Sequence, residues 1–299
     1  MQKVLILLST FNGEKYLSQL LESILNQEKS NFSINILVRD DGSQDQTIKI
    51  LKKYTKILNL DYYIGKNIGP ASSFMDLVKN CAISFDYYLF CDQDDIWMEK
   101  KISSAIEKME NMNNKPCLYY CGADIVDENL NSIGGYFRDN RFTKSLIYSL
   151  ITGSLIPGCT MCFNRNLIAK AKQYIPSKIG MHDSWMHLIC LLYNGFVIGD
   201  ENKYILYRQH GNNVVGAGKS SRFKRLKRLV FCKNIYSNTY NQLLKVDVNH
   251  NAKNRRIIEM FVDYKLDFSK KKALLKIKNK FLSKKEKLNF SLKIIFNLF

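Results

Sequence analysis

The sequence predicts an α/β protein with a mixed, mostly parallel central sheet, followed by a basic α-helical C-terminal region. Through the first 120 residues, strand-like and helix-like runs alternate, which is typical of βαβ units. Residues 219–299 carry 22 Lys and Arg against 5 Asp and Glu, whereas the first 218 residues carry 23 against 22. This asymmetry predicts a catalytic or binding domain over 1–218 and a separate basic region over 219–299.

Each expected element rests on hydrophobic spacing. The apolar run 4–8 indicates a first strand, and leucines and isoleucine at helical spacing over 14–26 indicate a first helix. By the same criteria the chain continues with a strand at 34–38, a helix at 47–54, a strand at 60–64, a helix at 72–82 and a strand at 87–91. A later helix is expected over 184–192.

Composition narrows the class of protein. The 299 residues are 46 % hydrophobic and 12 % aromatic, which is enough for a folded core. The N-terminal apolar run lacks a basic region and a cleavage site, and no apolar stretch reaches the roughly 18 residues that span a bilayer. We therefore expect a cytoplasmic protein with reduced, buried cysteines. A zinc site is a weaker alternative because its candidate ligands lie in strand-like surroundings: Cys117, Cys121, Cys159 and Cys162.

Polar clusters follow directly on four of the expected strands, at Ser9-Thr10, Asp40-Asp41, Asn67 and Asp92/Asp94/Asp95. In open α/β sheets, ligands bind at the carboxyl ends of the strands, where such loops meet. Carboxylates crowded together repel one another unless a cation lies between them, so the sequence favours Mg²⁺ or Mn²⁺ shared with a phosphate-bearing substrate. A solvated loop with a helix N-cap is the simpler alternative. Neither a Gly-x-x-x-x-Gly-Lys loop nor a Gly-x-Gly-x-x-Gly loop is present.

Over residues 3–215 the sequence resembles inverting nucleotide-sugar glycosyltransferases of family 2, which have the GT-A fold. The resemblance rests on a series of short motifs. They are Ser-Thr-Phe-Asn-Gly (9–13), Arg-Asp-Asp-Gly-Ser-Gln-Asp-Gln-Thr (39–47), Asn-Ile-Gly (67–69), Cys-Asp-Gln-Asp-Asp-Ile-Trp (91–97), His-Asp (182–183) and Tyr-Arg-Gln-His-Gly-Asn-Asn (207–213). The Asp-Gln-Asp-Asp-Ile-Trp form is most similar to bacterial rhamnosyltransferase-type members.

The resemblance implies roles for individual residues. Asp183 matches the general base, although it also suits a helix cap, and Asp94 and Asp92 match the metal-binding Asp-x-Asp motif. His210 is expected to complete the metal shell or contact the diphosphate. The nucleotide would be bound by Ser9, Thr10, Asn12, Asp40, Asp41, Asn67 and Asp92. The sugar or acceptor would contact Asp95, Trp97, Gly158, Cys159, Thr160, His182 and Arg208, of which Trp97 and His182 also suit simple packing. His187 is expected to be structural and Arg39 to be peripheral.

The resemblance therefore implies a metal-dependent transferase that moves a sugar, rhamnose or another hexose, from a UDP- or dTDP-sugar to a glycan acceptor. A UDP or dTDP preference follows if Asp41 accepts a hydrogen bond from the pyrimidine ring N–H. The alternatives are another Mg²⁺-nucleotide enzyme, such as a nucleotidyltransferase, and a GT-A-fold scaffold without turnover.

The basic region mixes Lys and Arg with apolar residues at helical spacing, in 222–231 and 270–281. Such segments bind anionic membrane surfaces, which suits a peripheral enzyme with a lipid-linked acceptor at the inner face of the membrane. A helical bundle with a homodimer contact is the alternative. Nucleic acid is disfavoured as a partner because no reader motif is present.

Overall fold

The computed structural model describes residues 1–28, 31–112, 114–136, 143–153, 156–210, 238–247, 251–276 and 282–297. Its strands are β1 (Gln2–Thr10), β2 (Phe32–Asp40), β3 (Leu60–Ile64), β4 (Tyr87–Asp92), β5 (Ile96–Trp97), β6 (Cys117–Val126), β7 (Ser132–Tyr136), β8 (Met161–Asn164) and β9 (Phe196–Arg208). Its helices are α1 (Leu17–Leu25), α2 (Thr47–Tyr54), α3 (Pro70–Asn80), α4 (Lys101–Met109), α6 (Leu146–Thr152), α7 (Arg165–Lys172), α8 (His182–Leu192), α10 (Ala252–Asp263), α11 (Phe268–Leu275) and α12 (Lys284–Ile295), with a 3₁₀ turn, η1, at Gly158–Thr160.

The strands form one mixed sheet in the order β3-β2-β1-β4-β8-β6-β9-β5, with β7 paired to β6. The pairs β2/β3, β1/β2, β1/β4 and β6/β9 are parallel, while β8 runs antiparallel to both β4 and β6. The predicted mixed, mostly parallel sheet is confirmed, and each strand and helix expected up to residue 91 is present within a few residues of its expected bounds.

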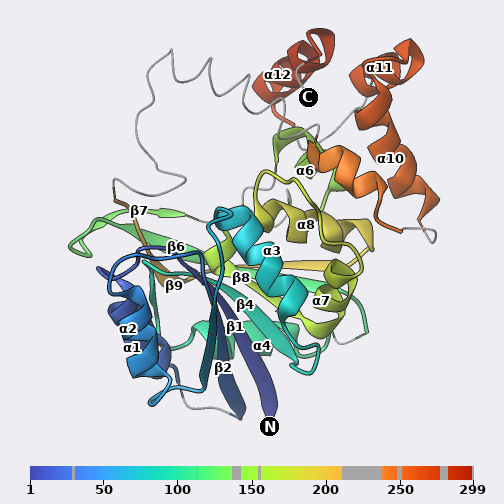
Figure 1. The fold of residues 1–299 in the computed structure, drawn as a ribbon. Helices are drawn as coiled ribbons and strands as arrows, with labels where there is room; N and C mark the ends of the chain where they lie inside the picture. Colours follow the sequence, from blue (N-terminus) through green and yellow to red (C-terminus); the bar gives the residue numbers. More distant parts are fainter. Residues whose placement is uncertain are drawn as a thin grey trace.

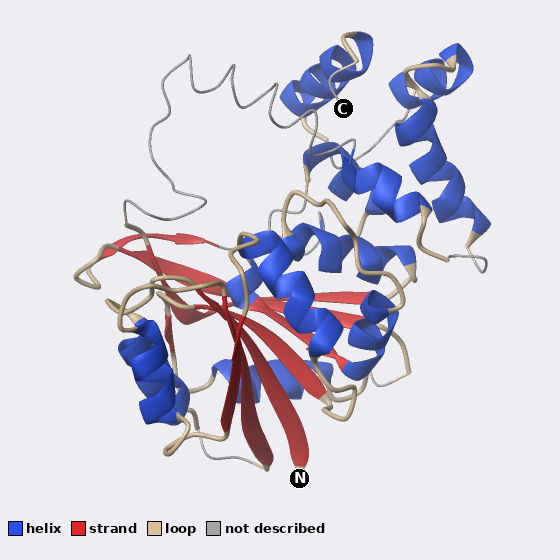
Figure 2. Cartoon of the chain, in the orientation of Figure 1, coloured by secondary structure: helices blue, strands red, loops and turns tan. Residues whose placement is uncertain are grey.

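Helices cover both faces of the sheet, as Figure 2 shows, with α1, α2 and α4 on one side and α3, α7 and α8 on the other (Figure 1). The alternation of side chains along β1 explains the two cores. Val4, Ile6 and Leu8 pack into the α1 and α4 side, and Leu5 and Leu7 into the α3 and α8 side. Because both faces are buried, β1 is an almost continuous apolar run and not an alternating one.

The parallel register brings the polar strand ends level with one another. Ser9 pairs with Arg39 on one side and with Asp92 on the other, and Thr10 pairs with Asp40. These neighbours place three of the sequence motifs at one edge of the sheet, although they are distant in the chain.

The helices after residue 238 pack onto the core of the sheet domain. Tyr240, Ile258 and Phe261 belong to the same hydrophobic cluster as Trp185 of α8, and the Tyr240 hydroxyl donates to the carbonyl oxygen of Leu150. The expected domain boundary at 218 and the basic segment 222–231 lie outside the described residues. In the described part of the chain, no helix is both long and apolar enough to cross a membrane.

Candidate active site

A cleft of about 1090 Å³ lies at the carboxyl ends of β1, β2 and β4, where the sequence motifs meet. Eleven of the residues expected in the site line it: Ser9, Thr10, Asn12, Asp41, Asn67, Asp92, Asp94, Gly158, His182, Asp183 and His210. The topology therefore brings together side chains from seven separate stretches of the chain. The chemical roles of these residues stay predictions.

The first two motif loops are joined by their own hydrogen bonds. The backbone N–H of Asn12 donates to Ser43 Oγ (2.8 Å), and that of Gly13 donates to Thr47 Oγ1 (2.8 Å). In return, Asn12 Oδ1 accepts from the N–H of Gln44 (2.9 Å). Asn12 has a φ of 47°, a left-handed conformation that asparagine tolerates better than most residues. Thus Asn12 lines the cleft and also holds the neighbouring loop in place.

Gln93 joins the motif at 91–97 to the motif at 9–13. Its Oε1 accepts from the N–H of Phe11 (2.9 Å), and its Nε2 donates to the Phe11 carbonyl oxygen (3.0 Å). A Cβ on Gly13 would clash with Gln93 Oε1, so a larger residue at position 13 would displace this contact. Gln93 was not singled out from the sequence, although it lies inside the Asp-Gln-Asp-Asp motif.

The adjacent carboxylates Asp40 and Asp41 have different surroundings. Asp40 is buried and accepts hydrogen bonds from Thr10 Oγ1 and from the N–H groups of Gly42 and Ser43, so its oxygens organise the turn after β2. Gly42 has a φ of +87°, which explains why the turn requires glycine. Asp41 lies at the cleft.

Asp41 is held by partners on two sides. The N–H groups of Ile68 (3.0 Å) and Gly69 (2.9 Å) donate to its carboxylate, which ties β2 to the loop before α3. The guanidinium of Arg39 forms an ion pair with it from below. Arg39 was expected to be peripheral, and this expectation is wrong. Its side chain is buried, and its guanidinium contacts Asp41, Ser73, Asp76 and the carbonyl oxygen of Lys66.

The floor of the cleft carries an acidic cluster with one imidazole. His210 Nε2 lies 2.7 Å from Asp94 Oδ2, and the imidazole ring stacks at a tilt against Tyr16 with 5.1 Å between the ring centroids. Burial, together with the charges of Asp94 and Asp183, raises the pKa of Asp92 to about 7. This floor therefore favours positive charge, and its oxygen and imidazole donors suit a divalent cation.

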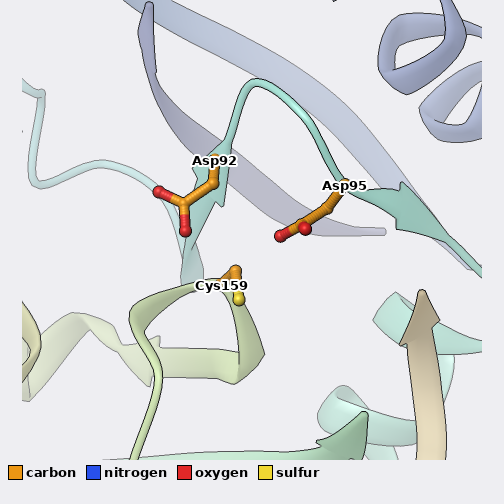
Figure 3. Close-up of side chains that lie close together, drawn as sticks. All are labelled: Asp92, Asp95 and Cys159. Atoms are coloured by element: carbon orange, nitrogen blue, oxygen red, sulfur yellow. The ribbon is translucent and has the colours of Figure 1, made fainter. Parts of the chain in front are cut away.

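Behind the floor lies a second group, formed by Asp92, Asp95 and Cys159, whose potential ligand atoms are all within 4.8 Å of one another (Figure 3). Burial is the main cause that raises the pKa of Asp95 well above its usual value. One of its oxygens accepts from the N–H of Arg208 (3.1 Å), and the other, Oδ2, is buried without a hydrogen-bond partner among the described residues.

Lys101 provides a positive charge next to this group. Its side chain is buried, and its Nζ donates to the carbonyl oxygen of Cys159 (2.8 Å) and lies 4.8 Å from the centre of the Trp97 ring. Its charge lowers the pKa values of Asp92 and Cys159, although burial and the neighbouring carboxylates outweigh it. Lys101 carried no signal in the sequence, because it reads as an ordinary lysine at the start of a helix.

Asp183 occupies the first turn of α8 and lines the cleft. Burial raises its pKa to about 6, while the N–H groups of Ser184 and Gly158 partly offset that effect. The neighbouring His182 stacks on Phe74 with 3.9 Å between the ring centroids, and burial lowers its pKa to about 3. His182 is therefore neutral at physiological pH, whereas Asp183 is a carboxylate of raised basicity.

The remaining expected contacts lie behind the cleft wall, namely Asp40, Asp95, Trp97, Cys159, Thr160 and Arg208. Arg208 shows why. Its guanidinium donates to the carbonyl oxygens of Asp94 (2.8 Å) and Glu128 (2.7 Å), so it fixes the loop that carries Asp94. These six residues are placed to support the lining and not to form it. His187, also buried, lies 2.7 Å from the carbonyl oxygen of Thr143, in keeping with the structural role expected for it.

The alternative zinc site receives no support from the geometry. All seven described cysteines are buried thiols, and within the described ranges the cysteines at 117, 121, 159 and 162 form no group at ligand distances.

The mixed sheet and the acidic cleft at its strand ends fit the GT-A fold that the sequence resemblance implies. The family model "Glycosyl transferase family 2" matches residues 5–168, so the chain belongs to this family and is a glycosyltransferase. The sequence is 29 % identical over 235 residues to dTDP-rhamnosyl transferase RfbG of Shigella flexneri, covering 73 % of this chain and 78 % of RfbG. It is 24 % identical to the poly(ribitol-phosphate) beta-N-acetylglucosaminyltransferase TarS of Staphylococcus aureus, over 77 % of this chain and 40 % of TarS.

Solved structures support the same fold. The structure of S. aureus TarS 1-349 with UDP-GlcNAc has a TM-score of 0.62 at 18 % identity and covers 100 % of this chain and 82 % of that one. The mannosyltransferase PcManGT of Pyrobaculum calidifontis, in complex with GDP-Man and Mn²⁺, has a TM-score of 0.54 at 13 % identity, over 98 % of this chain and 84 % of that one.

Proposed function

We propose that the chain is a metal-dependent, inverting glycosyltransferase that moves a hexose, such as rhamnose, from a UDP- or dTDP-sugar to a glycan acceptor. RfbG, a family member of similar length, is a dTDP-rhamnosyl transferase by name, and TarS was crystallised with UDP-GlcNAc. Both donors carry a pyrimidine base that offers a ring N–H. The acceptor is a cell-surface glycan, assembled on a lipid carrier at the cytoplasmic face of the membrane.

The residues of the cleft floor fit a divalent cation. Asp94 Oδ2 and His210 Nε2 already converge at 2.7 Å. Asp92 adds a carboxylate whose pKa is raised to about 7 by burial and by the charges of Asp94 and Asp183, and a bound cation would favour its charged form. Asp94, Asp92 and His210 would hold Mn²⁺ or Mg²⁺. Such an ion offsets the charge that develops on a departing nucleoside diphosphate.

The observation that carries the proposal is the position and basicity of Asp183. Inverting transfer needs a base on the face of the sugar away from the diphosphate. Asp183 lines the same cleft as Asp92 and Asp94, on a different element, and its pKa of about 6 leaves it charged but basic at neutral pH. In the proposed step the acceptor oxygen bonds to C1 of the sugar, its proton passes to Asp183, and the bond from C1 to the diphosphate oxygen breaks.

The neighbouring side chains have supporting roles. Ser9, Asp41 and Asn67 would bind the nucleoside, at the end of the cleft formed by β1 and β2. Gly158 and His182 would contact the sugar or acceptor beside Asp183, and the neutral imidazole of His182 can exchange hydrogen bonds with hydroxyl groups without competing as a base.

The test is calorimetric titration of the protein with UDP, dTDP, GDP and CDP, each with and without Mn²⁺, followed by transfer assays with the sugar nucleotides of the bases that bind. Binding of UDP or dTDP that requires Mn²⁺, and a product of inverted anomeric configuration by NMR, would support the proposal. Binding without any turnover on a panel of glycan acceptors would favour the scaffold alternative. No binding of any nucleotide would reject both.

A further inference from the structure

Helix α12 has apolar side chains on two opposite faces. Phe290 and Ile294 are buried in the hydrophobic cluster beneath the helix. At 100° per residue, Leu288, Leu292 and Ile295 lie on the opposite side, and all three are exposed. A helix that only covers a core needs one apolar face and presents polar residues on the other. The second apolar face is therefore not accounted for by folding.

The neighbouring helix also exposes large apolar side chains. Leu266, just before α11, is 97 % exposed, and Phe268 at its first position is 80 % exposed. The two helices are in contact, because Lys271 Nζ donates to the carbonyl oxygen of Ile295 and to Asn297 Oδ1, both at 3.1 Å. We call the exposed apolar residues of this helix pair the α11–α12 surface: Leu266, Phe268, Leu275, Leu288, Leu292, Ile295 and Phe296.

The surroundings of the α11–α12 surface are strongly basic. Residues 251–276 and 282–297 contain 12 Lys and Arg against 4 Asp and Glu. Lys272, Lys284 and Lys287 lie on the same two helices, Lys276 directly follows α11, and all four are exposed. Basic residues that surround apolar side chains are the pattern of helices that lie in the interface of an anionic bilayer.

We propose that the α11–α12 surface docks on an anionic lipid bilayer, with its leucine, isoleucine and phenylalanine side chains in the interface and its lysines at the headgroups. Charge decides between a bilayer and a second copy of the chain. Two copies joined through this surface would bring their lysine rims together, and like charges at an interface cost affinity. Anionic headgroups instead neutralise them, at about 1 kcal/mol for each lysine near the surface.

The location of the α11–α12 surface suits an enzyme with a membrane-bound acceptor. Helices α11 and α12 lie at the end of the molecule toward which β1 and β2 run, which is also the end that carries the cleft (Figure 1). Docking there would keep the cleft close to the bilayer. The inference rests on the exposed helices and not on the proposed chemistry, so either can fail without the other.

The test uses the full chain and sedimentation with vesicles of phosphatidylcholine, with and without phosphatidylglycerol. The variant Leu288→Gln/Leu292→Gln/Phe296→Gln removes three exposed apolar side chains without touching the core. The matched control is Leu25→Gln/Ile57→Gln/Ile83→Gln, which changes three exposed apolar residues elsewhere. We expect the wild type to bind the anionic vesicles, added salt to weaken binding, and the α12 variant to bind at least about tenfold more weakly, since each partly inserted side chain contributes to partitioning.

The control and α12 variants should match the wild type in circular dichroism and in thermal unfolding, which shows that both are folded whether or not the proposed function holds. The proposal is overturned if the wild type does not bind anionic vesicles, or if the α12 variant binds them as the wild type does. It is also overturned if the wild type is a dimer by light scattering without lipid and the α12 variant is a monomer, because the surface would then join two copies.

Discussion

Arg39 and Asp41 form an ion pair beneath the cleft, and each side chain is only 4 % exposed. The same guanidinium donates to Ser73 Oγ (3.0 Å), to Asp76 Oδ2 (3.1 Å) and to the carbonyl oxygen of Lys66 (3.0 Å). Ser73 Oγ in turn lies 2.6 Å from Ser9 Oγ. One buried cation thus connects β1, β2, α3 and the loop before α3, which together form the proposed nucleoside end of the cleft.

Replacing Arg39 should therefore weaken nucleotide binding and lower stability. Arg39→Ala leaves Asp41 buried without its cation, and the loss of one partner of a buried pair costs about 3 kcal/mol. Arg39→Lys keeps the charge but cannot reach all four partners, so we expect a folded protein with about tenfold weaker binding of UDP or dTDP. Urea unfolding and calorimetric titration measure the two effects.

Arg165→Ala is the matched control for Arg39, because Arg165 pairs with Asp86 at the surface, where such pairs contribute about 0 to 1 kcal/mol. If Arg39→Lys binds the nucleotide with unchanged affinity, Arg39 is only a structural residue of the sheet edge and does not position the site.

The sheet was predictable because its signals are local. Short, mostly apolar runs of five residues, separated by segments with helical spacing, predict β1 to β4, and the polar residues that follow those strands indicate where the site lies. The antiparallel return through β8 was not predictable in this way, since its pairing with β4 and β6 depends on contacts between residues far apart in the sequence.

Residue identity predicts membership of the site better than it predicts which side chains face the cleft. Asp94 and Asp95 are adjacent in the same motif, yet Asp94 lines the cleft while Asp95 points behind it to the N–H of Arg208. The turn after β4 sets these directions. Lys101 is the opposite case, a residue near the site that the sequence does not indicate. Only the folded chain brings its Nζ to the carbonyl oxygen of Cys159.

The cation site is tested by Asp94→Asn. The substitution removes the charge that lies 2.7 Å from His210 Nε2 while preserving shape, so we expect Mn²⁺-supported nucleotide binding to be lost. Mn²⁺ should also raise the melting temperature of the wild type but not of the variant, because a ligand that binds only the folded state stabilises it. Asp61→Asn, at an exposed position on β3, is the control. If Mn²⁺ raises the melting temperature of all three proteins equally, the cation binds at another site.

The general base is tested by Asp183→Asn. Without a proton acceptor, turnover should fall by about 10² to 10⁴, whereas donor binding should stay within a few-fold of the wild type. Folding should improve, because burial of the charged carboxylate is unfavourable, and we expect a gain of about 1 kcal/mol in the free energy of unfolding at pH 8. Initial rates, donor titration and urea unfolding distinguish these effects. Retained turnover would assign the base to another residue.

The pH dependence of the reaction should follow the same carboxylate. Burial raises the pKa of Asp183 from 3.8 to about 6, and only the charged form can accept the proton of the acceptor. At saturating Mn²⁺, kcat/KM should therefore be constant above about pH 7 and fall tenfold per unit below about pH 6. The stability of the folded protein should change with pH in the opposite direction to the rate. A raised carboxyl pKa favours the folded state at low pH, and this contribution to stability is lost as the pH rises through about 6. Donor titration over the same range supplies the control, because loss of metal or nucleotide binding would lower the rate for another reason. A profile that stays flat to pH 5 while the donor remains bound would exclude Asp183 as the titrating base.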